Sequence, residues 1–189
     1  MKHTMTRALF AAVLSLWLTT SALAGFNEGF AAYQRDDYAT AFEEWLPIAE
    51  QGHAAAQKHL GTMYEFGQGV SQDYAEAVKW YRLAAEQGIV FAQYNLGGMY
   101  RKGRGVPQDN AEAVKWWRLA AEQGDDDAQT NLGLMCLNGK GVPQDYIQAH
   151  MWSSLAAAKG NENGRKNRDI IAKKMTAADI STRISQMNP

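Results

Sequence analysis

The sequence repeats itself every 36 residues, and this period constrains the possible fold more than any other feature. Shifting the 189-residue chain against itself by 36 positions aligns identical residues over three successive units. A fixed period of about 20 to 50 residues is typical of stacked repeats, in which each unit needs its neighbours to bury its apolar face. We therefore expect a stack of small units. The recurring columns include Gly52, Gly88, Gly124 and Gly160; Leu60, Leu96 and Leu132; Gly61, Gly97 and Gly133; Gly69, Gly105 and Gly141; Asp73, Asp109 and Asp145; and Trp80, Trp116 and Trp152.

The second half of each unit has the pattern of an amphipathic helix. In the first unit, the apolar residues between positions 74 and 85 follow each other at spacings of three and four, which places them on one helical face. Asp73, with Glu76 three residues later, predicts a capping box at the start of this helix, and Gly88 predicts its end. The pattern predicts helices over about residues 73–87, 109–123 and 145–159.

The first half of each unit predicts a second helix, over about residues 54–66 in the first unit. Gly61 lies inside this helix, where glycine costs about 1 kcal/mol relative to alanine, so we expect a neighbouring helix to approach closely there. Residues 67–72 contain two glycines, and the later copies add a proline, which predicts a defined turn between the helices.

The recurring large side chains predict a packed interior. A ligand binds once, whereas a packing requirement returns with every unit, so we interpret the tryptophan column as core or as wedges between units. Leu83 and its copies widen the same helical face, and we expect them to pack with it. These columns are Trp80, Trp116 and Trp152, and Leu83, Leu119 and Leu155.

The complete motif resembles the Sel-like repeat (SLR) family, a relative of the tetratricopeptide repeat. Its clearest copy reads AQYNLG from Ala92, GRGVPQD from Gly103 and AVKWWRLAAEQG from Ala113. The resemblance implies an all-α fold: an α-solenoid, or right-handed superhelix, of stacked antiparallel helix-turn-helix repeats with period 36. It also implies that the protein is a protein-binding scaffold. Three residues differ from those at the equivalent positions of the other units: Ser71, Cys136 and His150.

The ends of the chain differ from the middle, as terminal units of a stack should. We divide the chain into a shorter tetratricopeptide-like unit, three SLR repeats and a C-terminal cap with a further short helix over about 176–187. Pro47 is expected to kink the second helix of the N-terminal unit. The expected segments are 1–24 (signal peptide), 25–52, 53–88, 89–124, 125–160 and 161–189.

The first residues have the pattern of a secretory signal peptide. A basic start is followed by an apolar run over positions 8–18, and small residues precede an expected cleavage between Ala24 and Gly25. The apolar run is well below the roughly 20 residues that span a bilayer. No cysteine follows for lipid attachment, so we expect a periplasmic or secreted protein without stable membrane insertion.

Composition and motif searches point away from catalysis and from nucleic acid. The chain has 19 Lys and Arg against 20 Asp and Glu, so its net charge of −1 does not favour a polyanion partner. The glycine-rich turns lack the spacing of phosphate-binding loops. His53 and His59 are six residues apart, which does not suit a zinc pair on one helical face. We therefore expect that the protein binds no cofactor and no metal and that it is not an enzyme.

Two residues that replace recurring side chains are interpreted as structural. Cys136 stands in a tyrosine column, where we expect a small buried apolar group; the alternative is a reactive thiol or an intermolecular disulfide. His150 stands in a valine column, where we expect a partly buried imidazole with a backbone partner.

Specificity is expected where the repeat register is kept but the residue changes. By resemblance to tetratricopeptide repeats, the first helices line a concave wall. In the second SLR repeat, the wall positions pair two aromatic residues with two cations, which suits a peptide with apolar and acidic side chains. The candidate partner-binding residues are Lys58, Glu65, Phe66, Phe91, Tyr94, Arg101, Lys102, Thr130 and Asn138; further positions of the wall are Ala55, Thr62, Gly98, Asp127, Leu134 and Leu137.

We therefore hypothesise a monomeric, non-enzymatic interaction scaffold of the bacterial envelope that binds a partner protein or peptide on its concave face. An alternative is a regulator of a sensor kinase, or a secretion or host-interaction factor. From another class, a β-lactam or peptidoglycan hydrolase would need a nucleophile or metal set that the sequence does not display.

Overall fold

The computed structural model describes residues 24–176, and these residues form helices and connecting turns without a strand. The expected signal peptide at 1–24, except for Ala24, and the expected helix at 176–187, except for Thr176, lie outside the described residues. Residues 24–33 are helical, and the further helices are α2 (Tyr38–Glu50), α3 (Ala54–Phe66), α4 (Tyr74–Glu86), α5 (Val90–Lys102), α6 (Asn110–Glu122), α7 (Asp126–Asn138), α8 (Tyr146–Ala158) and α9 (Glu162–Ala172). The predicted all-α helical-repeat fold is confirmed.

The chain divides into two compact units, with the boundary after Leu83 inside α4. In the first unit, α2 packs on α3, and the helix at 24–33 and α4 contribute to the same core. Trp45 and Leu60 are fully buried in this core, together with Met63. Helix α2 continues through Pro47 to Glu50, so the proline does not end it.

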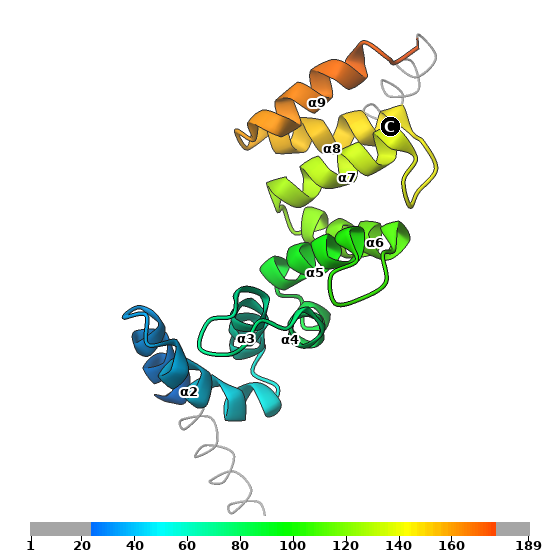
Figure 1. Cartoon of the computed structure of the whole chain (residues 1–189). Helices are drawn as coiled ribbons and strands as arrows, with labels where there is room; N and C mark the ends of the chain where they lie inside the picture. Colours follow the sequence, from blue (N-terminus) through cyan, green and yellow to red (C-terminus); the bar gives the residue numbers. More distant parts are fainter. Residues whose placement is uncertain (1–23, 177–189) are drawn as a thin grey trace, which may run out of the picture. The chain divides into compact units, whose positions relative to one another are not determined.

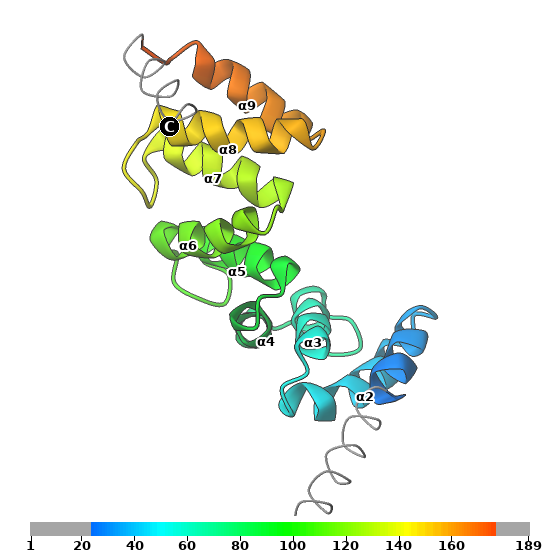
Figure 2. The same ribbon diagram turned by 180° about the vertical axis from the view of Figure 1, so that it is seen from behind.

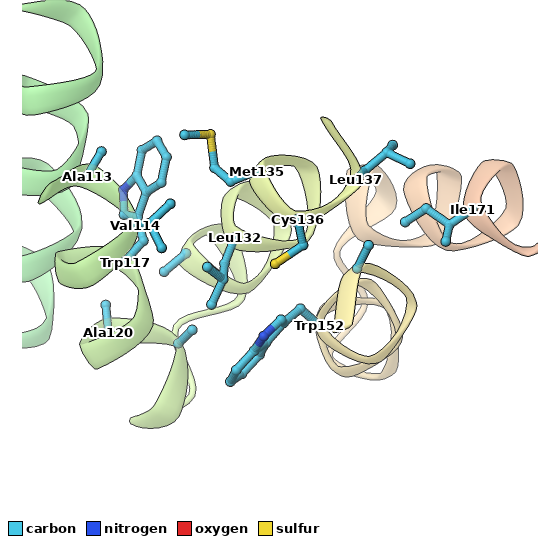
Figure 3. Packing of buried hydrophobic residues seen from close by; sticks show 13 residues of the cluster. Ala113, Val114, Trp117, Ala120, Leu132, Met135, Cys136, Leu137, Trp152 and Ile171 are labelled. Carbon is cyan, nitrogen blue, oxygen red and sulfur yellow. The ribbon is translucent and has the colours of Figure 1, made fainter. Parts of the chain in front are cut away.

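The second unit is a run of consecutively packed helices. Figures 1 and 2 show α5 to α9 following one another in chain order, and α9 also contacts α7. In Figure 3, Leu132 and Cys136 of α7 lie between Trp117 of α6 and Trp152 of α8. Helix α7 is therefore covered on both sides by the second helices of two successive repeats.

The helix starts confirm half of the predicted capping box. Asp109 accepts hydrogen bonds from the amides of Ala111 (2.8 Å) and Glu112 (3.1 Å), as an N-cap should. The reciprocal bond is not the one expected, because the Asp109 amide donates across the turn to the carbonyl oxygen of Tyr100. Glu112 pairs instead with Lys115 at 3.3 Å. The N-cap backbone thus fixes the turn to the end of the preceding helix.

The glycines inside the first helices lie against large side chains of the second helices, as predicted. A Cβ on Gly61 would stand 2.5 Å from the ring of Tyr81, and a Cβ on Gly97 would stand 2.6 Å from that of Trp117. Both distances are too short for real atoms. Glycine is therefore required at these positions because an aromatic ring occupies the space of its missing side chain.

The turn glycines reach back to the preceding repeat. Gly69 has φ +70°, and a Cβ there would stand 2.5 Å from the carbonyl oxygen of Tyr38 at the start of α2. Gly141 has φ +73°, and a Cβ there would overlap the carbonyl group of Asn110 at the start of α6. Both positions need the left-handed backbone and the close approach that glycine allows.

The two recurring columns of large side chains differ in burial. The tryptophans at positions 80, 116 and 152 are buried, as predicted. The expectation that the leucine column packs with them was wrong, because Leu83, Leu119 and Leu155 are 38 to 44% exposed. A helix in a stack is covered by few neighbours, so only part of a wide apolar face becomes interior.

Candidate interaction surface

A recurring column of glutamine side chains connects each first helix to the helix before it through hydrogen bonds. Gln93 is buried at the start of α5 and donates through Nε2 to the carbonyl oxygen of Ala85 (3.1 Å). Gln57 and Gln129 make the same bond to Ala49 and Ala121, at 2.9 and 3.0 Å. Sequence reasoning missed these glutamines, although their spacing of 36 residues was a signal of a structural role.

A second glutamine column closes each turn. Gln72, Gln108 and Gln144 donate through Nε2 to the carbonyl oxygens of Glu65, Arg101 and Leu137, at 2.7 to 2.9 Å. These carbonyls lie in the last turns of the first helices, where no helical amide remains to bond them. The bonds use the backbone of the candidate residues, so their side chains can change from repeat to repeat without loss of the turn.

Helix α5 presents a continuous line of candidate residues, which we call the α5 stripe: Phe91, Tyr94, Gly98, Arg101 and Lys102. Phe91 is 47% exposed, and Arg101 and Lys102 are also exposed. Neither cation has an ion-pair partner among the described residues. A Cβ on Gly98 would meet no atom within 4 Å, so open space lies above the middle of the stripe.

Tyr94 has a structural role besides its place in the stripe. It is half-buried against the core, and its carbonyl oxygen accepts a hydrogen bond from Nε1 of Trp117 at 3.0 Å. Burial raises the pKa of the Tyr94 hydroxyl, and the negative charge of nearby Asp127 raises it further. Tyr94 is therefore partly covered by the core of the second unit, whereas Phe91 is the more exposed aromatic group.

Helix α7 offers less to a partner than the sequence suggests. Thr130 is buried, and its hydroxyl donates to the carbonyl oxygen of Asp126 in its own helix. Leu137 is also buried, whereas Asn138 is exposed at the end of the helix. The start of α7 is acidic, and Asn161 donates to Asp126 (2.7 Å) and to Asp127 (3.0 Å).

The candidate residues of the first unit lie on α3. Lys58 is partly buried, which lowers the pKa of its ammonium group. Glu65 accepts a hydrogen bond from the Tyr81 hydroxyl at 2.8 Å. Phe66 is 64% exposed at the end of the helix, the highest exposed fraction among the large hydrophobic side chains of the described residues. Phe66 is therefore the side chain of α3 that is most available to a partner.

The histidines of the first unit contribute to its packing. His53 caps α3 by accepting from the Ala56 amide through Nδ1, and its ring lies 4.9 Å from that of Phe26. The His59 ring stacks on Trp45 with centroids 4.3 Å apart. Burial lowers the pKa of His59 to about 4, and the charge of Lys58 acts in the same direction. His59 is therefore a neutral aromatic group near pH 7.

Cys136 and His150 occupy the core of the second unit. Cys136 is a buried thiol, and burial raises its pKa. His150 is buried, and its Nδ1 lies 3.1 Å from the Ser154 hydroxyl. The expected backbone partner of His150 stays a prediction. A high thiol pKa reduces the thiolate that would act as a nucleophile.

The described part of the chain holds no group of three or more His, Cys, Asp or Glu side chains that could bind a metal ion. Over residues 24–176, every helix is too short or too polar to cross a lipid bilayer.

The comparisons with known proteins match the repeat architecture. The model of the Sel1 repeat matches residues 54–89, 90–125 and 126–161. No curated protein matches the chain. Among solved structures, the protective antigen c5321 of uropathogenic Escherichia coli, which displays an SLR fold, is 43% identical over 79% of this chain, with a TM-score of 0.73. A Sel1 repeat protein from Oxalobacter formigenes is 35% identical over 75% of this chain, with a TM-score of 0.71.

This chain spans a smaller part of both structures, 33% of the first and 58% of the second. Sel1 repeat proteins are generally protein-interaction scaffolds, and the family is typically non-enzymatic. Three consecutive matches cover more than half of the sequence, so the chain belongs to the Sel1 repeat family.

Proposed function

We propose that this protein is a non-enzymatic interaction scaffold of the bacterial envelope that binds a partner protein or peptide through the first helices of its repeats. The envelope location is supported by the signal pattern at the start of the sequence. The interaction role is supported by the family, whose members generally bind proteins.

One observation carries the choice of surface. The recurring glutamines bond between helices, as Gln93 does to the carbonyl oxygen of Ala85, whereas the α5 stripe exposes Phe91, Arg101 and Lys102, which differ from repeat to repeat. Aromatic residues and arginine are enriched at protein interfaces, and the stripe exposes Phe91 and Arg101. The exposure of these variable side chains favours the first helices as the binding surface.

Site-specific photocrosslinking in intact cells tests this proposal. A benzophenone amino acid at Phe91 should form an adduct with a partner that mass spectrometry identifies. Leu119 on α6 is 39% exposed and serves as the matched position on a second helix. We expect adducts from Phe91 and not from Leu119. Adducts only from Leu119, or from neither position, would remove the first helices from the binding role. The identity of the partner also decides whether the protein acts on a sensor kinase or on another envelope component.

A further inference from the structure

We propose that the α5 stripe binds an acidic peptide segment in an extended conformation, with an apolar anchor on Phe91 and Tyr94 and its carboxylates on Arg101 and Lys102. This inference rests on the proposed function and adds the chemistry and the direction of the ligand. It concerns the second unit alone.

The cations at the end of α5 are not required by the repeat. Basic side chains stabilise a helix C-terminus through its dipole, which is the structural role that Arg101 and Lys102 could have. The equivalent residues are Glu65 and Phe66 on α3, and Leu137 and Asn138 on α7, so neither of those helices has a basic residue in its last turn. The charge is therefore a property of this one repeat and is available for recognition.

Acidic residues of α7 act on the other end of the stripe, at Tyr94. Helix α7 begins with Asp126 and Asp127, and the charge of Asp127 acts on the Tyr94 hydroxyl. A carboxylate of the ligand is repelled near Tyr94 and attracted near Arg101. A polyanion of uniform charge, such as nucleic acid, would meet both ends and is disfavoured. The charge separation thus sets the direction in which the peptide lies.

The length of the stripe sets the spacing in the ligand. Ten residues separate Phe91 from Arg101, which is about 15 Å along a helix. An extended peptide advances about 3.3 Å per residue, so its apolar and acidic side chains should be four or five residues apart. Gly98 leaves open space between the two ends, which lets the peptide backbone approach the helix.

Selection from a library of random twelve-residue peptides tests this chemistry with the full chain as bait. We expect enrichment of peptides with an aromatic or large aliphatic residue four or five positions from a pair of acidic residues. The variant R101E/K102E should lose this enrichment at least tenfold. The variant K166E/K174E makes the same change of charge at exposed positions on and just after α9 and should retain it.

Other outcomes would overturn the inference. Enrichment of basic peptides, equal enrichment on R101E/K102E, or no enrichment above background each contradicts an acidic ligand on α5. If sedimentation shows self-association that R101E/K102E abolishes, the occupant is a second copy of the chain and the peptide proposal fails. A partner crosslinked at Phe91 together with a failed selection would leave the scaffold function standing, whereas loss of both would remove the function as well.

Discussion

The second and third repeats share one backbone plan but fill its centre differently. In the second repeat, Gly97 of α5 makes room for the indole of Trp117, which is 2% exposed and donates to the carbonyl oxygen of Tyr94. In the third repeat, the equivalent pair is Gly133 and Ser153. A Cβ on Gly133 would stand 2.6 Å from the serine hydroxyl and 3.2 Å from the carbonyl oxygen of Ala149.

The same glycine therefore serves two kinds of packing. In the second repeat it admits a large ring, and in the third it lets the backbone of α8 come close. The Ser153 hydroxyl is buried without a hydrogen-bond partner, so it gains nothing from its polarity. The comparison teaches that a recurring residue fixes where helices meet, while its partner decides how closely they meet.

Truncation of the central side chain should change the free energy of unfolding very differently in the two repeats. We expect Trp117→Ala to lower the free energy of unfolding by about 3–5 kcal/mol, because it leaves a large cavity and removes the bond to Tyr94. Ser153→Ala removes only an unpartnered hydroxyl and should leave stability unchanged or raise it by up to about 1 kcal/mol. Urea denaturation measures both; equal losses would show that the two centres are equivalent.

The glycine that ties the third repeat to the second should be the next most sensitive position. Gly141→Ala adds the cost of a left-handed backbone to an overlap with Asn110, and we expect a loss of about 2–4 kcal/mol. Gly160 has φ +91°, but a Cβ there would meet no atom within 4 Å, so Gly160→Ala should cost only about 1–2 kcal/mol. A thermal melt that ranks the two variants in reverse order would contradict the contact between repeats.

The first repeat extends the comparison through pH, because His59 stands where later repeats have Asn95 and Asn131. The folded pKa of about 4 lies below the usual 6.5, so the unfolded chain binds the proton more readily. Stability should fall by about 1–2 kcal/mol as pH is lowered from 7 to 5, and this contribution should level off below pH 4.

His59→Asn restores the residue of the later repeats and serves as the control for this effect. Urea midpoints measured between pH 7 and pH 4 should lose part of their slope in this variant. An unchanged slope would show that His59 does not carry the pH dependence.

The helix caps should show the smallest difference between the second and third repeats. Asp109 accepts two backbone amides, whereas Asp145 accepts one, from Gln148 at 2.9 Å. We expect Asp109→Ala to cost about 1 kcal/mol and Asp145→Ala somewhat less. Chemical denaturation of both variants checks the order, and a larger loss for Asp145→Ala would mean that the bond count does not measure the strength of a cap.

Local signals in the sequence predicted the helices well. The expected helix at residues 54–66 is α3, and the one expected at 73–87 is α4 within one residue at each end. Caps, turn glycines and apolar spacing all act over a few residues, so a single sequence contains them. The partner of each cap amide was missed, because the bond from Asp109 to Tyr100 depends on how the turn folds back.

The candidate surface was only partly accessible to sequence reasoning. Variation within the repeat register pointed to Phe91, Arg101 and Lys102, which are exposed, but also to Thr130, which is buried. Which flank of a helix a neighbour covers depends on how the helices cross. The exposed Leu119 shows the same limit, because its recurrence alone did not distinguish interior from surface.

The contact of Gly141 with the start of α6 restricts how such a chain can change in length. A residue inserted into this turn would move the glycine away from Asn110 and push a side chain into a space that has no room for one. Repeat arrays of this kind should therefore gain or lose whole 36-residue repeats, while their inner turns keep a constant length and tolerate few insertions or deletions.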